Sequence, residues 1–304
     1  MPSVSSLEEA AEALAAAQAE GRRVRIGEDL TAAGLNRILE HDPGDLTCTV
    51  EAGVRLSELR AALAASGQRL SLDPPGDPTI GALLARNVSG PLRHRFGAPR
   101  DLVLGATLVL ADGTIASAGG KVVKNVAGYD LARLMCGSEG RLAFIARASF
   151  KLHPLPKASR ALVVETADAA DVVATLLGSQ LQPSALDVLH PGRVAVLFEG
   201  SERAVAAQVR ATQALVGGDD KDTSVWDESR RRQEASKGRV HFGPGSLADV
   251  LADHANAVIR PAAGVAFTPD PIPSVDQSQG ASRGADALVE RIRQELDPRG
   301  VLAA

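Results

Sequence analysis

The sequence predicts an α+β protein of two domains. Its 304 residues are 45% hydrophobic and 23% charged, which is typical of a globular protein long enough for two domains. Helix-prone stretches are mixed with short apolar runs and many glycines, and this mixture is typical of the α+β class. The segment His-Pro-Leu-Pro-Lys at residues 153–157 leaves little room for helix or sheet. We therefore predict a domain boundary there, between residues 1–157 and 158–304.

The N-terminal part is predicted to begin with a helix. Ser6 and Glu9 form a capping box, and the alanine-rich run that follows them is helix-prone. Alternation of polar and apolar residues then predicts strands at residues 22–26 and 45–52. Residues 56–65 carry apolar side chains at helical spacing, so a second helix is expected before the Asp-Pro-Pro-Gly loop that follows.

A β-hairpin is predicted in the middle of the chain. Residues 102–110 form an apolar run, the sequence Ala-Asp-Gly-Thr at residues 111–114 is a turn, and residues 115–118 are the returning strand.

The C-terminal half alternates helix-like, alanine-rich stretches with strands at residues 161–165 and 194–198. The charged stretch at residues 217–238 is expected to be an exposed loop or helix. Residues 269–284 are expected to be mobile.

Charge and cysteine content exclude several classes of function. Lys and Arg number 33 against 37 for Asp and Glu, a formal net charge of −4, so no basic field exists for nucleic acid or an anionic membrane. Cys48 and Cys136 form no Cys-x-x-Cys pair, which argues against an iron–sulfur cluster, a structural zinc site or a disulfide framework. The longest apolar stretch, residues 102–111, is too short to span a bilayer, and the acidic N-terminus lacks a secretory pattern. We expect a cytoplasmic protein without direct membrane insertion, whose membrane association would come through partners.

The first of two glycine-rich blocks covers residues 79–91 and 97–105. Glycines let backbone N–H groups approach a diphosphate closely, and Thr79, Asn87 and Ser89 can add side-chain hydrogen bonds. The same residue types also mark tight surface turns, and spacing does not decide between the two interpretations. A Rossmann fingerprint after a strand and a Walker sequence are both missing, so neither of those nucleotide sites is predicted.

The second block carries a resemblance to a known family. It reads Gly-Gly-Lys-Val-Val-Lys-Asn-Val-Ala-Gly-Tyr-Asp-Leu at residues 119–131 and continues to Gly-Ser-Glu-Gly at residues 137–140. Together with Val-Glu-Ala-Gly and Asp-Pro-Pro within residues 45–75, these motifs are similar to the PCMH-type FAD-binding oxidases. Residues 124–131 resemble the FAD-binding subunits of bacterial glycolate oxidases almost letter for letter, and the resemblance covers residues 1–157.

This resemblance implies a PCMH-type FAD-binding domain of two α+β subdomains over residues 1–157. A smaller α+β domain over residues 158–304 would correspond to the C-terminal domain of FAD-linked oxidases. FAD would be bound non-covalently, since the first loop holds no histidine or cysteine. The residues that the resemblance places at the cofactor are Thr79, Ile80, Gly81, Asn87, Ser89, Gly90, Arg100, Asp101, Lys124, Asn125, Asp130, Gly137, Ser138 and Gly140.

Three features depart from the family's pattern. The loop after the first predicted strand is short where family members carry a glycine-rich diphosphate loop, and its acidic Glu28 and Asp29 would repel a diphosphate. Ala82 stands where a second glycine is common. Arg141 and Ala143 replace the usual threonine and glycine. We expect these departures to weaken FAD binding.

The second half shows no catalytic pattern. His190, His241 and His254 have no partner at metal-ligand spacing, so no metal site is predicted and no catalytic residue is assigned. The resemblance implies an FAD-binding accessory subunit that oxidises glycolate to glyoxylate, or a similar small 2-hydroxy acid, together with partners. Those partners would be a catalytic FAD-containing glycolate oxidase subunit and an iron–sulfur subunit. The alternative is a non-catalytic scaffold that keeps the fold and binds FAD weakly or not at all.

Overall fold

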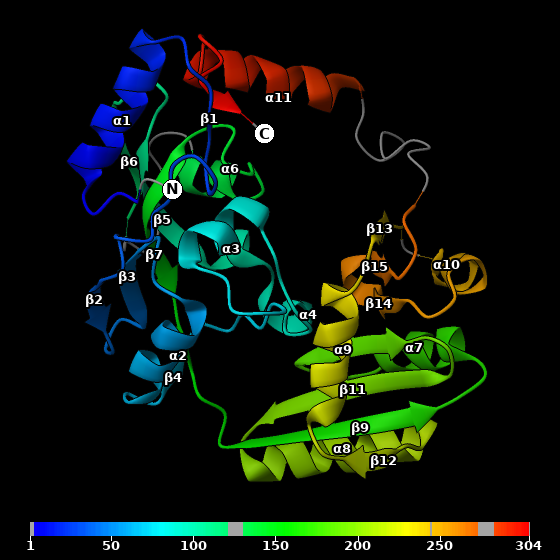
Figure 1. Ribbon diagram of the computed structural model, residues 1–304. Coiled ribbons are helices and arrows are strands. Elements are labelled where there is room, and N and C mark those ends of the chain that lie inside the picture. Colours follow the sequence, from blue (N-terminus) through cyan, green and yellow to red (C-terminus); the bar gives the residue numbers. More distant parts are fainter. Residues whose placement is uncertain (1–2, 121–129, 244, 273–282, 304) are drawn as a thin grey trace.

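The computed structural model describes residues 3–120, 130–243, 245–272 and 283–303. Figure 1 shows two bodies, each built around its own sheet. The N-terminal body contains a five-stranded antiparallel sheet, and the C-terminal body a seven-stranded antiparallel sheet. The predicted α+β class is therefore confirmed.

The five-stranded sheet has the order β2-β3-β7-β5-β6. Its strands, in that order, are Ile38–Asp42, Thr47–Glu51, Phe144–Lys151, Val103–Val109 and Ile115–Gly119. The predicted hairpin is confirmed, because β5 pairs with β6 from Gly105 opposite Gly119 to Val109 opposite Ile115. Two short helices, α4 (Arg93–Phe96) and α5 (Pro99–Leu102), precede β5.

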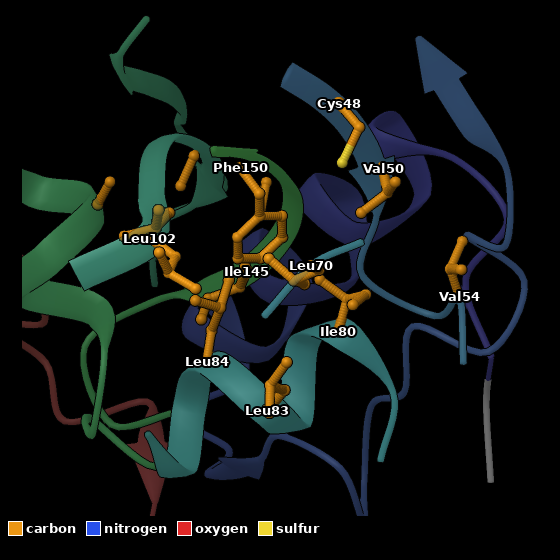
Figure 2. Close-up of a cluster of buried hydrophobic side chains, with 14 of the residues drawn as sticks. Cys48, Val50, Val54, Leu70, Ile80, Leu83, Leu84, Leu102, Ile145 and Phe150 are labelled. Carbon is orange, nitrogen blue, oxygen red and sulfur yellow. The ribbon is translucent and has the colours of Figure 1, made fainter. Parts of the chain in front are cut away.

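Helices cover both faces of this sheet. On one face α2 (Leu56–Ala64), α3 (Ile80–Arg86) and α6 (Leu131–Met135) bury the largest apolar cluster, in which Ile80, Leu83 and Phe150 are fully buried (Figure 2). On the other face α1 (Leu7–Ala19) packs against Phe144. The predicted N-terminal cap is confirmed, because the Ser6 hydroxyl accepts the Glu9 N–H at 3.1 Å.

The seven-stranded sheet has the order β12-β9-β11-β10-β14-β15-β13. Its strands, in that order, are Asp219–Lys221, Ala158–Glu165, Arg193–Gly200, Ala185–Leu189, Val258–Arg260, Val265–Thr268 and Gly238–His241, with a short 3-10 helix at Pro261–Ala263. Three helices cover one face: α7 (Ala169–Leu177), α8 (Glu202–Val216) and α10 (Leu247–Asp253).

The other face of the seven-stranded sheet carries α9 (Ser224–Glu234) and meets the N-terminal body. Trp226 of α9 is 3% exposed, and it shares this apolar cluster with Leu92 and Phe96 of the N-terminal body. The expectation that residues 217–238 are exposed is therefore wrong at α9, because two apolar residues in an otherwise charged segment anchor the helix on the sheet.

The end of the chain returns to the N-terminal body (Figure 1). Helix α11 (Arg283–Leu296) packs Ile292 and Leu296 on the core around α2 and α3, and β16 (Leu302–Ala303) pairs in parallel with β1 (Val24–Arg25). Strand β8 (His153–Pro154) pairs with β4 (Gln68–Arg69), and β9 begins the other sheet. The predicted boundary thus lies between the sheets, while residues 283–303 fold with the first one. Most of the stretch expected to be mobile, residues 273–282, lies outside the described residues.

Candidate functional site

A cavity of about 490 Å³ opens in the N-terminal body between the start of α3, the turn after β1 and the start of β7. This volume is ordinary for a small-molecule site. Much of the wall is backbone and small side chains: Gly27, Ala32, Ala33, Gly53, Gly81, Ala82, Ala85, Gly140 and Ala143. Such a wall lets a ligand approach the main chain closely.

Two glycines in the wall are required by packing. A Cβ on Gly53 would lie 2.1 Å from the Ala32 carbonyl oxygen, and one on Gly140 would lie 2.8 Å from the Ile26 Cβ. Gly140 also has a φ of +78°, which a side-chain-bearing residue rarely adopts. The Ile26 side chain therefore packs directly on the Gly140 backbone, which brings the turn after β1 against the loop that contains Gly140.

The first N–H groups of α3 are already hydrogen-bonded within the protein. The Gly81 N–H donates to the Ala52 carbonyl at 2.7 Å, and the Ala82 N–H donates to the Thr79 hydroxyl at 3.3 Å. The N–H of Ile80 donates to a carbonyl as well, and its side chain points into the core (Figure 2). These donors, which usually bind anions at a helix start, are not free here.

Other backbone donors on the wall remain available. The turn after β1 closes on itself, because the Gly27 N–H donates to the Leu30 carbonyl at 2.8 Å. By contrast, the N–H groups of Ala33 and Gly140 donate to no acceptor within the described part of the chain, and both residues line the cavity. These two N–H groups can serve an anionic ligand.

The acidic residues of the turn are partly neutralised by an arginine. Arg25 Nη1 lies 2.7 Å from Glu28 Oε2, and Arg25 Nε lies 3.3 Å from Asp29 Oδ2. The Arg25 backbone N–H also donates to the Asp29 carboxylate, and this hydrogen bond is the main cause that lowers the pKa of Asp29. Arg86, at the end of α3, lines the cavity and forms no ion pair with another described residue. Within the described residues, the wall therefore holds a cation without an ion-pair partner beside the acidic turn.

Three of the predicted site residues line this cavity: Thr79, Gly81 and Gly140. Of the residues that depart from the family pattern, Glu28, Ala82 and Ala143 also line it. Arg141 instead pairs with Glu139, with 2.8 Å between Nη2 and Oε2.

Several predicted residues lie beside the cavity instead of on it. Asn87 ends α3 with a φ of +49°, and its Oδ1 accepts the N–H of Arg100 at 3.3 Å. The Asp101 carboxylate accepts the Ala98 N–H at 2.8 Å, and a Cβ on Gly97 would collide with it. These contacts organise the connection from α3 to β5.

The remaining predicted residues do not line the cavity. Some are hydrogen-bonded to other parts of the fold, and one has no partner in the described residues. Asp130 caps α6 by accepting the Arg133 N–H at 3.1 Å, and Gly137 donates its N–H to the end of α3. The Ser138 hydroxyl is buried and has no hydrogen-bond partner in the described residues. The Ser89 carbonyl accepts hydrogen bonds from the C-terminal body, and Gly90 packs against the Asp73 backbone. Lys124 and Asn125 lie outside the described residues.

Sequence reasoning missed part of the cavity wall. Thr31, Ala32 and Ala33 contribute from the chain beyond the turn, and Ala303 contributes from the last strand. Among the wall residues that were missed, Gly53 alone had a local sequence signal, because a glycine directly after a predicted strand marks a close backbone contact. The alanines and the single threonine belong to no recognisable motif.

Known proteins share both the sequence and the fold. Residues 29–119 match the family described as FAD binding domain. Glycolate oxidase subunit GlcE of Escherichia coli (strain K12) is 35% identical over 201 residues, which are 64% of this chain and 56% of that protein. Glycolate oxidase subunit GlcD of Bacillus subtilis (strain 168) is 35% identical over 182 residues, which are 58% of this chain and 39% of that protein. The matched part thus spans between two fifths and just over half of these relatives.

The fold is shared more widely than the sequence. A structure of alkyldihydroxyacetonephosphate synthase superposes with a TM-score of 0.74 over 98% of this chain and 75% of that one, at 16% identity. Within the described residues, no helix is long and apolar enough to cross a membrane.

Proposed function

We propose that the chain is a PCMH-type FAD-binding oxidase component, namely the non-covalently FAD-binding accessory subunit of a 2-hydroxy-acid oxidase complex. The observation that supports this proposal best is the cavity beside α3. It brings together two separate segments that the resemblance assigns to the cofactor, one with Thr79 and Gly81 and the other with Gly140.

The residues around the cavity suit the dinucleotide part of FAD. The N–H groups of Ala33 and Gly140 would donate to its phosphate oxygens, and Arg86 would supply positive charge. The buried, unpartnered Ser138 hydroxyl adjoins this wall in sequence and would gain a partner. When bound, FAD supplies the two-electron oxidation chemistry, while the chain binds and orients it.

An accessory role suits the second body. His190, His241 and His254 lie on separate elements, at the end of β10, in β13 and after α10, so the described part of the chain does not gather them into one site. We propose that a catalytic FAD-containing subunit and an iron–sulfur subunit complete the complex. Oxidation of glycolate to glyoxylate would then release two electrons and two protons, and the electrons would pass to the iron–sulfur subunit. We place the complex in the cytoplasm, with membrane association only through partners.

The purified full-length chain tests the proposal directly. We expect a flavin absorbance spectrum and complete release of the flavin into the supernatant on acid precipitation. Glycolate with an artificial electron acceptor should give no turnover with this chain alone and turnover after the two partner subunits are added. Turnover by the chain alone would overturn the accessory role, and flavin that stays with the precipitate would overturn non-covalent binding.

A scaffold without flavin is the second candidate function. It is favoured by one observation, the internal use of the α3 N–H donors of Gly81 and Ala82. A colourless protein that gains no flavin on incubation with FAD, yet is needed for assembly of the complex, would establish this candidate instead.

A further inference from the structure

Arg260, the last residue of β14, carries a buried guanidinium group. The residue is 3% exposed, and its Nε lies 3.4 Å from Oδ1 of the fully buried Asp187. Its Cζ lies 5.0 Å from the centre of the Phe267 ring. A buried arginine that contacts a carboxylate and an aromatic face has little freedom to move. If it left either partner, a charge in the interior would lose its compensating contact, which costs free energy.

The outer end of this guanidinium reaches into the N-terminal body. Arg260 Nη1 donates to the carbonyl oxygen of Ser89 at 3.2 Å, and Gln233 Nε2 donates to the same oxygen at 3.0 Å. Arg260 Nη2 in turn donates to Gln233 Oε1 at 2.8 Å. One carbonyl of the N-terminal body therefore accepts hydrogen bonds from two side chains of the C-terminal body, and these two side chains are hydrogen-bonded to each other.

Ser89 is connected to the cavity through α3. Ser89 follows the end of α3 by only a few residues. The carbonyls of Leu84 and Ala85, at that end, accept the N–H groups of Gly137 and Glu139 at 3.0 and 2.8 Å. Both the start of α3 and the loop at residues 139–140 line the cavity. Ser89 is therefore linked through the end of α3 to two parts of the cavity wall.

We infer that Arg260 is a positioning residue of the cavity: through the Ser89 carbonyl it holds α3 and the loop at residues 137–140 in place, without lining the cavity itself. The C-terminal body thus acts on the FAD site from a distance. The part of this inference that concerns FAD rests on the proposed function, whereas the part that concerns α3 does not.

The test compares full-length Arg260→Met and Arg260→Lys with Arg193→Met. Arg193 is the matched control, because its bidentate contact to Glu228, at 3.0 and 2.6 Å, lies wholly within the C-terminal body. Arg260→Met should weaken FAD binding about tenfold, because FAD binding must then order α3 and the loop at residues 137–140, and Arg260→Lys should weaken it less. Amide hydrogen exchange should become faster at residues 80–90 and 137–140 and stay unchanged in β5 and β7. Arg193→Met should change neither measurement.

Two arrangements keep the test decisive. If Arg260→Met alone does not fold, the double variant Asp187→Asn/Arg260→Met removes both buried charges and is measured instead. Unchanged exchange in α3 in either variant would overturn the inference. If the wild-type chain binds no FAD, the proposed function fails, and the exchange measurement alone decides whether Arg260 positions α3.

Discussion

Arg69 and Glu199 join the two bodies through a bidentate ion pair, with both Nη–Oε distances at 2.7 Å. Arg69 lies in β4 of the N-terminal body, and Glu199 lies in β11 of the C-terminal body. The two side chains are only 16% and 9% exposed, so water screens their attraction weakly. Arg69 also stacks over the Phe96 ring, 5.2 Å from its centre. This contact orients the bodies in addition to joining them.

Breaking this pair should destabilise the protein strongly. We expect Arg69→Met or Glu199→Gln to cost about 2–5 kcal/mol in the free energy of unfolding, because each leaves a poorly hydrated partner. The double variant should cost much less than the sum of the two. Urea unfolding followed by circular dichroism measures all three. Arg22→Met is the control, since its pair with Glu20 is mostly exposed, and its cost should stay below about 1 kcal/mol. Additive single effects would mean that the pair has no coupling energy.

Gly90 should tolerate no side chain. A Cβ at this position would lie 1.8 Å from the backbone oxygen of Asp73, and backbone cannot rotate away as a side chain can. We expect Gly90→Ala to cost about 3 kcal/mol or more in the free energy of unfolding. Gly243→Ala is the matched control, because no described atom beyond its chain neighbours lies within 4 Å of its Cβ position, and it should change stability by less than about 0.5 kcal/mol. Equal midpoints of unfolding for the two variants would contradict the packing argument.

Local signals predicted local structure well. The hairpin of β5 and β6 was visible in its apolar run and its Asp-Gly turn, and the first helix in its Ser6 cap. The pairing of Val24 with Leu302 had no such signal. Two-residue strands at opposite ends of a chain carry no periodicity, and only the packing of α11 brings them together.

The candidate site was also predicted only in part. The resemblance pointed to Thr79, Gly81 and Gly140, which line the cavity. It could not reveal Ala33, whose contribution is a backbone N–H that any residue would provide. It also could not show that the donors of α3 are used internally, since this depends on the carbonyl of Ala52, which lies far from the helix in sequence.

Asp73 should make stability depend on pH. Burial raises the pKa of its carboxyl to about 6 from 3.8, although Arg260, the Leu92 N–H and Arg230 act in the opposite direction. Between these two values the folded state binds more protons than the unfolded state, so this group's contribution falls as pH rises through the window. The shift corresponds to roughly 3 kcal/mol.

Asp73→Asn isolates this contribution, because asparagine does not titrate and can still accept the Leu92 N–H. The free energy of unfolding of Asp73→Asn, minus that of the wild type, should rise by up to roughly 3 kcal/mol from about pH 4 to about pH 7. Urea titrations across this range measure the difference. Asp45→Asn, at an exposed position, is the control and should show a much smaller change. A pH-independent difference for Asp73→Asn would show that the carboxyl does not titrate in this window.

The acidic turn after β1 should limit FAD affinity. Arg25 pairs with both Glu28 and Asp29, so one negative charge is left unbalanced on the turn beside the cavity. The Glu28 and Asp29 side chains are 61% and 38% exposed, and solvent screening therefore reduces each effect to about 0.5–1 kcal/mol. We expect Glu28→Gln and Asp29→Asn each to tighten FAD binding about threefold and the double variant about tenfold.

Calorimetric titration measures these affinities, and Glu202→Gln, on α8 of the other body, should leave them unchanged. Because the effect is electrostatic, it should shrink when the salt concentration is raised from about 0.05 M to about 0.5 M. Affinities that do not respond to either substitution would mean that the diphosphate lies away from this turn.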